Sequence, residues 1–502
     1  MVFPSEKEFL HLSRKGNLIP VYQEINGDLE TPVSAYFKIA QAAKYSFLLE
    51  SVEGEEKVAR YSFLARDPEI VIRSKNGKVE IFRRNSRGLS LDSSEKTDNP
   101  LVTLRKLMSR YKFVSIPGLP RFCGGMVGYM SYDVVRYFEK IPHTTLDDLK
   151  LPDVLLAVAK NIIIFDHRNH KIKVVSCVKT ETKDSPAQKK ARYRKALQTI
   201  NGLISELKAP LRVPGGNAKA AKTALKVSSN FTESQFQNII KKAKKKIQVG
   251  DIIQVVLSQR FMTAIKTSPF NIYRALRTLN PSPYMYYLNF DSIQIIGSSP
   301  ELLVRCEDGI VDTRPIAGTR PRGKTDDEDT AYAKDLLNDP KEKAEHIMLV
   351  DLGRNDLGRV CQKGKVSLSE FMIIEKYSHV MHIVSNVRGK LRPDKDIFDV
   401  LQACFPAGTV SGAPKIRAME IIDELENVNR GPYAGCIGYF SFSKNLDTCI
   451  TIRTIITTGG KAYVQAGAGI VADSQPHKEY RETVNKAKAQ IMALETAHQQ
   501  PS

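Results

Sequence analysis

The 502-residue sequence has no tryptophan, no cysteine pair spaced C-x-x-C and no apolar run of membrane-spanning length. Its seven cysteines are odd in number and scattered, which argues against a disulfide framework or a zinc site and predicts reduced thiols. The N-terminus lacks the basic-then-apolar pattern of a signal peptide. We therefore expect a cytoplasmic protein without a membrane segment.

Acidic residues are too few to balance the basic ones, since 75 Lys and Arg against 55 Asp and Glu leave a formal charge of +20. Such a charge raises nucleic acid as a partner. The excess lies largely between Lys160 and Lys246, where aromatic residues are not interleaved as a base-stacking platform would need. A solvated basic helix face is the simpler interpretation, so we expect no nucleic-acid partner. A basic RNA-associated protein stays the alternative, which salt-sensitive binding would reveal.

Length and composition predict a globular protein of two domains. Short β-type segments dominate from Leu18 to about Val178, and Asn76-Gly77 marks a tight hairpin turn. Residues 210–227, rich in Pro, Gly, Ala and Lys, are predicted to link domains 1–209 and 228–496. The second domain opens with a helix that ends at Gln248, followed by a strand over 252–259. The pattern predicts an α+β fold of largely antiparallel sheets in a sandwich-like arrangement walled by helices.

Two predicted helix starts, far apart in the chain, each present a Glu-x-x-Glu pair soon after an N-cap residue and a proline. The pairs are Glu342 and Glu345 after Asp339-Pro340, and Glu479 and Glu482 after Ser474 and Pro476. Glutamates three residues apart point from one helix face. Four carboxylates converging from two helices would form the oxygen site that Mg²⁺ prefers, with an anionic substrate completing its shell. The alternative is that these glutamates only complement the helix dipoles.

Three glycine-containing segments would let the backbone approach an anionic ligand closely. They are a turn over 315–320 with Gly318 and Thr319, a loop over 405–415 with Lys415 at a helix start, and a loop over 465–471. Free N–H groups at the helix start, with Lys415, could hold a carboxylate or phosphate. The second loop lacks the GxxxxGK[ST] order of a P-loop, and each segment alone is a weak signal.

Together these segments resemble the chorismate-utilising enzymes, and within them the large aminase subunits (component I) of anthranilate synthases. The resemblance is carried by PIAGTRPRG at 315–323, EKAEHIMLVDLGRNDLGRV at 342–360, PAGTVSGAPK at 406–415 and GAGIVADSQPHKEYRET at 467–483. It extends through residues 48–51 and 280–285 and leaves out only the Lys-rich middle of the chain.

The resemblance implies a site in which Mg²⁺ links the carboxylate of chorismate to Glu345 and Glu482. Glu342 and Glu479 would lie beside these ligands and orient the substrate or bound water. The implied chorismate contacts are Gly318, Thr319, Tyr433, Arg453, Gly467, Ala468 and Gly469, and Lys415 either joins them or caps local structure. Arg453 is expected on a strand over 449–455, where its fork would take a carboxylate unless it is only a surface cross-strand residue.

The implied reaction adds ammonia at C2 of chorismate while the C4 hydroxyl leaves, and then eliminates pyruvate to give anthranilate, the first step of tryptophan biosynthesis. Glu301 matches the general acid that protonates the hydroxyl, and Thr409 is grouped with it. His382 matches a histidine of the elimination step, although a lone His on an apolar strand is usually structural. No Gly-x-Cys-x-Gly turn occurs, so a separate glutamine amidotransferase subunit (component II) is expected, in a heterotetramer.

Feedback inhibition in this family implies an L-tryptophan site in the N-terminal domain. Ser51, at a strand end, would bond the polar groups of the amino acid, and Pro283, Tyr284 and Met285 would supply backbone contacts and an apolar wall. The alternative is that Ser51 only ends a strand.

The residues at two positions distinguish the branches of the family. Position 317 is Ala, where aminodeoxychorismate synthases have a nucleophilic Lys, and position 254 is Gln, where the water-using isochorismate and salicylate synthases have a basic Lys. Neither side chain here can attack or deprotonate, which favours ammonia addition at C2. A relative without catalysis is disfavoured because all four glutamates are present.

Overall fold

The structure is a computed structural model that describes residues 2–51, 60–212, 225–377 and 380–499. Most of the predicted linker, at 213–224, lies outside these residues, so the proposed domain boundary stays a prediction. Within the described residues, no helix is long and apolar enough to cross a membrane.

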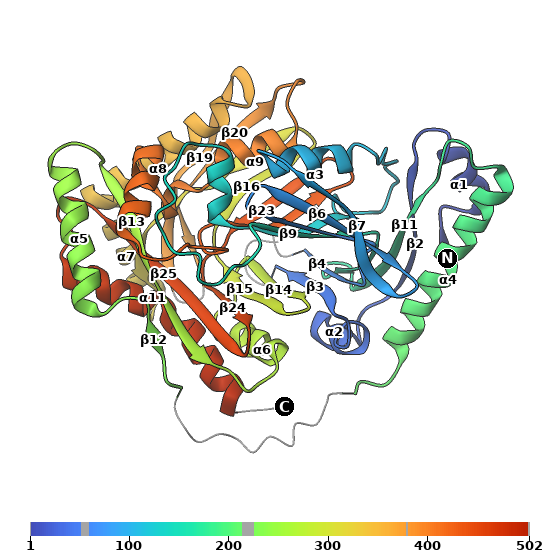
Figure 1. The fold of residues 1–502 in the computed structure, drawn as a ribbon, viewed down its shortest axis with the longest axis horizontal. Helices are drawn as coiled ribbons and strands as arrows, with labels where there is room; N and C mark the ends of the chain where they lie inside the picture. Colours follow the sequence, from blue (N-terminus) through green and yellow to red (C-terminus); the bar gives the residue numbers. More distant parts are fainter. Residues whose placement is uncertain (1, 52–59, 213–224, 378–379, 500–502) are drawn as a thin grey trace.

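Two large antiparallel sheets dominate the described part of the chain (Figure 1). The first has 13 strands in the order β1-β2-β11-β10-β4-β3-β14-β15-β24-β25-β13-β12, with β21 beside β13. Its strands are β1 (Val2–Phe3), β2 (Leu18–Asn26), β3 (Tyr45–Glu50), β4 (Tyr61–Arg66), β10 (Asn161–Asp166), β11 (Lys171–Lys179), β12 (Ser228–Ser229), β13 (Gln254–Ala264), β14 (Tyr284–Phe290), β15 (Ile293–Ser299), β21 (Gly412–Ala413), β24 (Thr454–Thr458) and β25 (Lys461–Ile470).

The second sheet has 12 strands among the described residues, in the order β18-β20-β17-β16-β23-β22-β8-β9-β5-β6-β7, with β19 beside β20. Its strands are β5 (Ile70–Lys75), β6 (Lys78–Asn85), β7 (Gly88–Lys96), β8 (Gly125–Met130), β9 (Val154–Ala159), β16 (Leu302–Glu307), β17 (Ile310–Thr313), β18 (Ile316–Pro321), β19 (Cys361–Lys376), β20 (Val380–Leu391), β22 (Cys436–Ser441) and β23 (Leu446–Ile450).

Helices lie around the sheets and carry most of the connections between distant strands (Figure 1). The helices are α1 (Glu6–Leu12), α2 (Pro32–Ile39), α3 (Pro100–Met108), η1 (Tyr132–Tyr137), α4 (Pro186–Lys208), α5 (Glu233–Gln248), α6 (Pro269–Leu279), α7 (Asp326–Asn338), α8 (Pro340–Gly358), α9 (Ile397–Cys404), η2 (Gly408–Val410), α10 (Lys415–Leu425) and α11 (Pro476–Gln499). The prediction of an α+β fold with antiparallel sheets and surrounding helices is confirmed.

One hydrophobic core fills the space between the sheets, because it contains buried residues of both. Leu288 and Ile295 come from the first sheet, and Val127 and Val158 from the second. A second core lies between the first sheet and helices α1, α2, α4, α6 and α11. Its apolar side chains include Tyr36, which stacks on Phe270 of α6. Packing of sheet on sheet and helix on sheet is the layered solution for elements with one apolar face.

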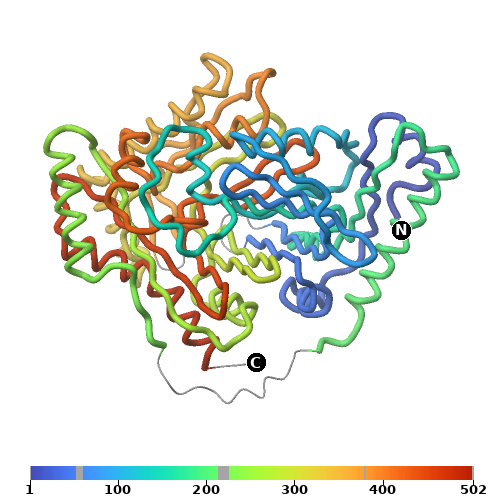
Figure 2. Tube along the Cα trace, in the orientation of Figure 1, coloured from blue at the N-terminus to red at the C-terminus, as the bar shows by residue number. Residues whose placement is uncertain are grey.

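Both sheets are built from the two halves of the chain. Strand β22, from the C-terminal half, pairs with β8 from the N-terminal half, and β14 pairs with β3. Figure 2 shows the resulting contact of early and late segments at the centre of the molecule. The halves are therefore joined by backbone hydrogen bonds in both sheets.

Several local predictions are confirmed, and the predictions for two glycine-containing segments are wrong. Asn76 and Gly77 have φ of 49° and 71° and join β5 to β6, as a tight hairpin turn requires. Helix α5 ends at Gln248 as predicted. The segment predicted as a turn over 315–320 instead enters strand β18 at Ile316, and this strand bulges between Ala317 and Arg320. The glycine segment 465–471 is not a loop, since strand β25 continues to Ile470.

Candidate active site

Of the first glutamate pair, Glu342 lies in the first turn of α8, as predicted, and Glu345 lies in the second turn. Pro340 occupies the start of the helix, and the Asp339 side chain accepts hydrogen bonds from the backbone N–H groups of Lys341 and Glu342 at 2.9 and 3.2 Å. Burial raises the pKa of Glu342, and the carboxylates of Glu345 and Asp339 raise it further. The turn therefore concentrates negative charge at a partly buried position.

Strand β18 lies directly against this turn. Gly318 has a φ of 68°, and a Cβ there would lie 3.1 Å from Glu342 Oε2 and 2.9 Å from Leu336 Cδ1. Glycine thus supplies both the left-handed backbone and the space that Glu342 needs. The bulge in β18 turns Gly318 and Thr319 toward the neighbouring strand β20.

His382 of β20 binds these two residues. Its Nδ1 lies 2.8 Å from the carbonyl oxygen of Gly318 and 3.1 Å from Thr319 Oγ1. A carbonyl can only accept, so Nδ1 carries the proton when the ring is neutral, and Nε2 is left as an acceptor. Burial lowers the pKa of His382, the hydrogen bond to the Gly318 carbonyl opposes the lowering, and the Arg453 guanidinium adds to it. The imidazole is therefore held neutral and in one tautomer.

Strands β13 and β25 close another side of the site. Gln254 Nε2 donates to Glu345 Oε1 at 3.1 Å. A Cβ at Gly469 would come within 2.7 Å of Gln254 Nε2, and one at Gly467 within 2.7 Å of Tyr433 Oη. Ala468 between these glycines is fully buried. The glycines of β25 thus admit Gln254 and Tyr433, so the glycine segment acts within a strand rather than as an anion-binding loop.

Of the second glutamate pair, Glu479 lies in the first turn of α11, again as predicted, and Glu482 lies in the second turn. Glu482 forms an ion pair with Lys486 at 2.6 Å, one turn further along the helix. Burial raises the pKa of Glu479, the Ser474 hydroxyl opposes the rise, and the Glu482 carboxylate adds to it. Lys341 of α8 also lowers the pKa of Glu479, so the two glutamate-bearing helix starts lie close enough to interact.

Arg453 is positioned differently from the prediction. The expected strand over 449–455 is interrupted, because β23 ends at Ile450 and β24 begins at Thr454. Arg453 lies between them with a φ of 52° and donates from Nη1 to the carbonyl of Lys486 at 2.8 Å. Burial lowers its pKa, and Glu482 opposes the lowering. The break in the strand, rather than strand alternation, turns this side chain toward α11.

Glu301 lies in the connection between β15 and β16 and shares a small cavity with Thr409 of η2. Burial raises the pKa of Glu301 to about 7, and the Thr409 hydroxyl and Lys486 partly offset the rise. The Thr409 hydroxyl is buried, and among the described residues it forms no hydrogen bond with good distance and angle. A carboxyl group with this pKa can donate a proton near neutral pH.

The acidic residues fit a hard cation only if a ligand completes its shell. Among the described residues, no group of three or more His, Cys, Asp or Glu side chains is placed to hold a metal ion, so the convergence of all four carboxylates is not seen. Each pair nevertheless carries unbalanced negative charge, and Gln254 Oε1 beside Glu345 is buried without a partner in the described part of the chain. Hard oxygen donors short of positive charge suit Mg²⁺ with a substrate anion.

Two basic residues bear on the sequence interpretation. Lys415 pairs with Asp356 at 2.7 Å and is largely buried, which supports the structural alternative for this residue. Lys486 was not singled out from the sequence, yet its Nζ donates to the carbonyl of Gly467 at 3.2 Å and pairs with Glu482. Its position four residues after Glu482 on one helix was the available signal.

The residues expected to bind an amino acid are also brought together. Met285 pairs with Glu50 in the sheet, so Tyr284 and Ser51 are the next positions along the same register. The Ser51 hydroxyl is buried without a hydrogen-bond partner among the described residues. Tyr284 donates to Asp447 at 3.0 Å, and Met285 is buried.

This fold and site define the chain as a member of the chorismate binding enzyme family, which matches residues 45–492. Anthranilate synthase component 1 of Acetivibrio thermocellus is 50% identical over 99% of both chains, and that of Aquifex aeolicus is 47% identical over 99% of this chain and 98% of its own. Within the family, the chain belongs to the anthranilate synthase component 1 branch.

A solved structure supports the same assignment. Anthranilate synthase component I from Streptococcus pneumoniae has a TM-score of 0.76 and 38% identity, covering 93% of this chain and 98% of its own. The resemblance drawn from the four sequence motifs is confirmed.

The environment of Glu301 predicts that the free energy of unfolding of this protein depends on pH. Because its pKa of about 7 in the folded protein exceeds the ordinary glutamate value of 4.5, the folded protein keeps a proton that the unfolded chain loses between these pH values. The free energy of unfolding should therefore fall as pH rises through this window, by on the order of 3 kcal/mol. Glu301→Gln should remove the fall.

Urea unfolding of both proteins at pH 5 and pH 8 measures the effect, with exposed Glu233→Gln as the control. The free energy of unfolding of Glu301→Gln, relative to that of the wild type, should increase with pH. Equal pH dependences in the two proteins would contradict the raised pKa of Glu301.

Proposed function

We propose that this protein converts chorismate and ammonia to anthranilate and pyruvate, as the large subunit of an anthranilate synthase. The observation that carries the proposal is the neutral amide of Gln254 against Glu345, together with a methyl group at Ala317 beside Gly318. Neither can form a covalent bond to the ring or activate water, so C2 is left to an external amine.

The residues of the site have roles that match the two chemical steps. Glu301 protonates the C4 hydroxyl as ammonia adds at C2, and water leaves. Thr409 lies beside this acid and moderates its pKa. His382, neutral and with Nε2 free to accept, takes the C2 proton as the C–O bond to pyruvate breaks and the ring becomes aromatic. Atoms balance as chorismate plus ammonia giving anthranilate, pyruvate and water.

The substrate carboxylates are matched by the cationic and metal-binding groups. Glu345 and Glu482 would hold Mg²⁺, with Glu342 and Glu479 beside them, and the bound ion would supply positive charge to the carboxylate on the ring. Arg453 offers a guanidinium fork near Glu482 for the other carboxylate. Tyr433, Thr319 and the strand Gly467-Ala468-Gly469 line the remaining surface.

We further infer that ammonia comes from glutamine through a separate glutaminase subunit. The component 1 designation of the relatives implies a component 2. The cysteines of the described residues are all buried, which suits structural thiols rather than an exposed glutaminase nucleophile. Free ammonium at high concentration and high pH should replace the partner.

The product distinguishes this function from its closest alternatives. Incubation with chorismate, Mg²⁺ and ammonium should release anthranilate, read by its fluorescence, and pyruvate in equal amount. Gln254→Lys should slow ammonia use, because an ammonium group would pair with Glu345, and should let some water compete. An amino-chorismate that keeps its pyruvyl group, or isochorismate, would assign the chain to another branch.

The two proposed metal ligands make a second test. Glu345→Gln and Glu482→Gln should lower turnover about 100-fold or more, because a metal contact to the reacting group is worth several kcal/mol. Glu233→Gln, which removes a first-turn glutamate from α5, is the matched control and should keep full activity. Near-normal rates for either site variant at limiting Mg²⁺ would refute the assignment.

We also propose that Ser51, Pro283, Tyr284 and Met285 bind L-tryptophan as a feedback inhibitor. The unpartnered Ser51 hydroxyl is the supporting observation. Ser51→Arg should abolish tryptophan binding in calorimetry by filling the site, whereas Ser93→Arg on exposed strand β7 should not. If the intact protein binds no tryptophan, the site does not exist, and if Ser51→Arg binds normally, it lies elsewhere.

A further inference from the structure

A buried ion pair between Glu426 and Arg430 lies behind the site and belongs to none of the roles above. The two side chains are only 2% and 1% exposed, and Arg430 Nε and Nη2 donate to the Glu426 carboxylate at 3.0 and 2.6 Å. Burying such a pair is costly unless its remaining hydrogen-bonding groups are satisfied. Their partners show what the pair does.

The remaining donors of Arg430 hold two backbone segments of the site. Nη1 donates to the carbonyl of Val410 at 2.7 Å, and Nη2 donates to the carbonyl of Val256 at 2.7 Å. Val410 directly follows Thr409, the neighbour of Glu301. Val256 pairs with Gly469 across β13 and β25. One guanidinium therefore ties the segment next to Thr409 to β13, the strand that pairs with the glycine-bearing strand β25.

Glu426 and the ring of Tyr433 complete this arrangement. Glu426 Oε1 accepts from the backbone N–H and the hydroxyl of Ser258 at 2.8 and 2.9 Å. Ser258 pairs with Gly467 in the sheet. The Arg430 guanidinium carbon lies 5.6 Å from the ring centroid of Tyr433, whose hydroxyl is placed next to Gly467. The pair thus contacts segments from both sides of the proposed substrate pocket.

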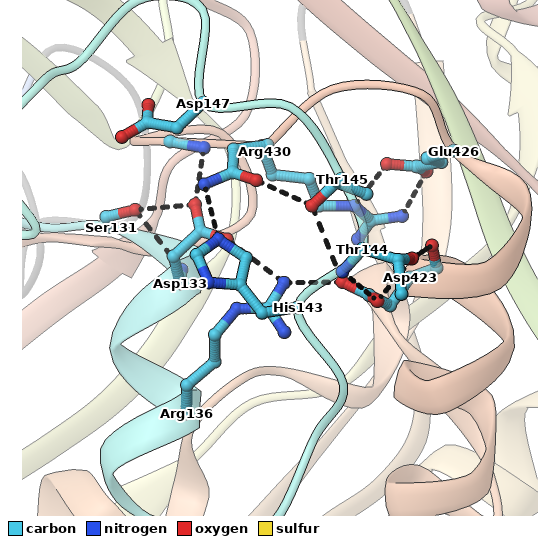
Figure 3. A network of polar contacts seen from close by, with 12 residues as sticks. Ser131, Asp133, Arg136, His143, Thr144, Thr145, Asp147, Asp423, Glu426 and Arg430 are labelled. Carbon is cyan, nitrogen blue, oxygen red and sulfur yellow. Dashed lines mark hydrogen bonds and ion pairs between the residues drawn. The ribbon is translucent and has the colours of Figure 1, made fainter. Parts of the chain in front are cut away.

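A second polar network adjoins the pair but faces away from these segments. Figure 3 shows Asp423 at the right of the drawn residues, joined by dashed lines to Thr144 and Arg136, with Glu426 above it. Asp423 accepts from Arg136 at 2.6 Å and from the Thr144 backbone N–H at 2.9 Å. Among the described residues, Arg136 pairs with Asp133 and Asp423 and forms no hydrogen bond or ion pair with Val410, Val256 or Tyr433. The chain therefore supplies a matched arginine that stabilises the fold without holding the site.

We propose that Arg430, oriented by Glu426, is a positioning residue for the reaction. It holds Thr409, Tyr433 and strand β25 in fixed positions around the substrate. This inference rests on the proposed function. Arginine suits the role because its planar fork donates to two carbonyls and a carboxylate at fixed angles, whereas the compact ammonium of lysine cannot span them. A displacement of about 1 Å in positioned groups can cost about 100-fold in rate.

The test compares Arg430→Lys with the control Arg136→Lys, whose side chain is 16% exposed and paired with Asp423. Arg430→Lys should lower kcat about 10- to 100-fold, with KM changed much less, while Arg136→Lys stays within about twofold of the wild type. Glu426→Gln provides a second variant if Arg430→Lys does not fold, and thermal midpoints report folding for each.

The pH profile separates positioning from general destabilisation. Glu301 must be protonated to act as an acid, so activity falls as pH rises past its pKa. Thr409 and Lys486 lower that pKa, and Asp356 lines the same cavity. Displacing Thr409 should move the alkaline limb of kcat to higher pH in Arg430→Lys, as in Thr409→Val, but not in Arg136→Lys.

The outcomes decide separately on the two proposals. If the wild-type protein makes no anthranilate, the proposed function fails. If it does, and folded Arg430→Lys or Glu426→Gln retains wild-type kcat and alkaline limb, Arg430 is a structural residue and the positioning proposal is overturned. Equal losses in Arg430→Lys and Arg136→Lys, with no change in the limb, overturn it as well.

Discussion

Face-to-face packing of two wide antiparallel sheets is the constraint on which the rest of this structure depends. The shared core draws on strands from both halves of the chain, so neither half can bury its inner face without the other. Because β18 and β20 lie at one end of the second sheet, and β25 and β13 near one end of the first, the residues of the site gather where these ends adjoin. Helices α8 and α11 place their first turns there.

The carboxylates in this region are only partly neutralised by neighbouring cations. Burial raises the pKa of Glu342 and of Glu479, the carboxylates of Glu345 and Glu482 raise it further, and the cations nearby (Arg320, Lys341 and Lys486) oppose the rise. Glu301 is treated differently, because it is buried with only Thr409 and Lys486 to favour its charged form. In the proposed function, the glutamates of the two helices serve as anionic ligands and Glu301 serves as the proton donor, so differences in burial and neighbouring charge would assign metal binding and acid catalysis to different carboxyl groups.

Behind the site, the interactions are of another kind. The Glu426–Arg430 pair is fully desolvated and saturated with backbone and hydroxyl partners, so its value lies in geometry rather than in net stability. The Asp423 network beside it ties the segment around Thr144 to the end of α10. Rigid support of this type lets the side chains that face the substrate remain few and polar.

The sequence by itself determined the local features that depend on near neighbours. Asp339 with Pro340 specified the start of α8, Asn76-Gly77 specified a hairpin turn, and the Glu-x-x-Glu spacing placed each glutamate pair on one helix face. The family motifs were likewise legible, because they are contiguous. Only the tertiary structure decided that the segment 315–320 is a bulged strand, that Arg453 occupies a break between strands and that Lys415 pairs with Asp356. Those outcomes, and the hydrogen bonds that Arg430 makes to several segments, depend on contacts between residues far apart in the chain. No local sequence pattern encodes such contacts.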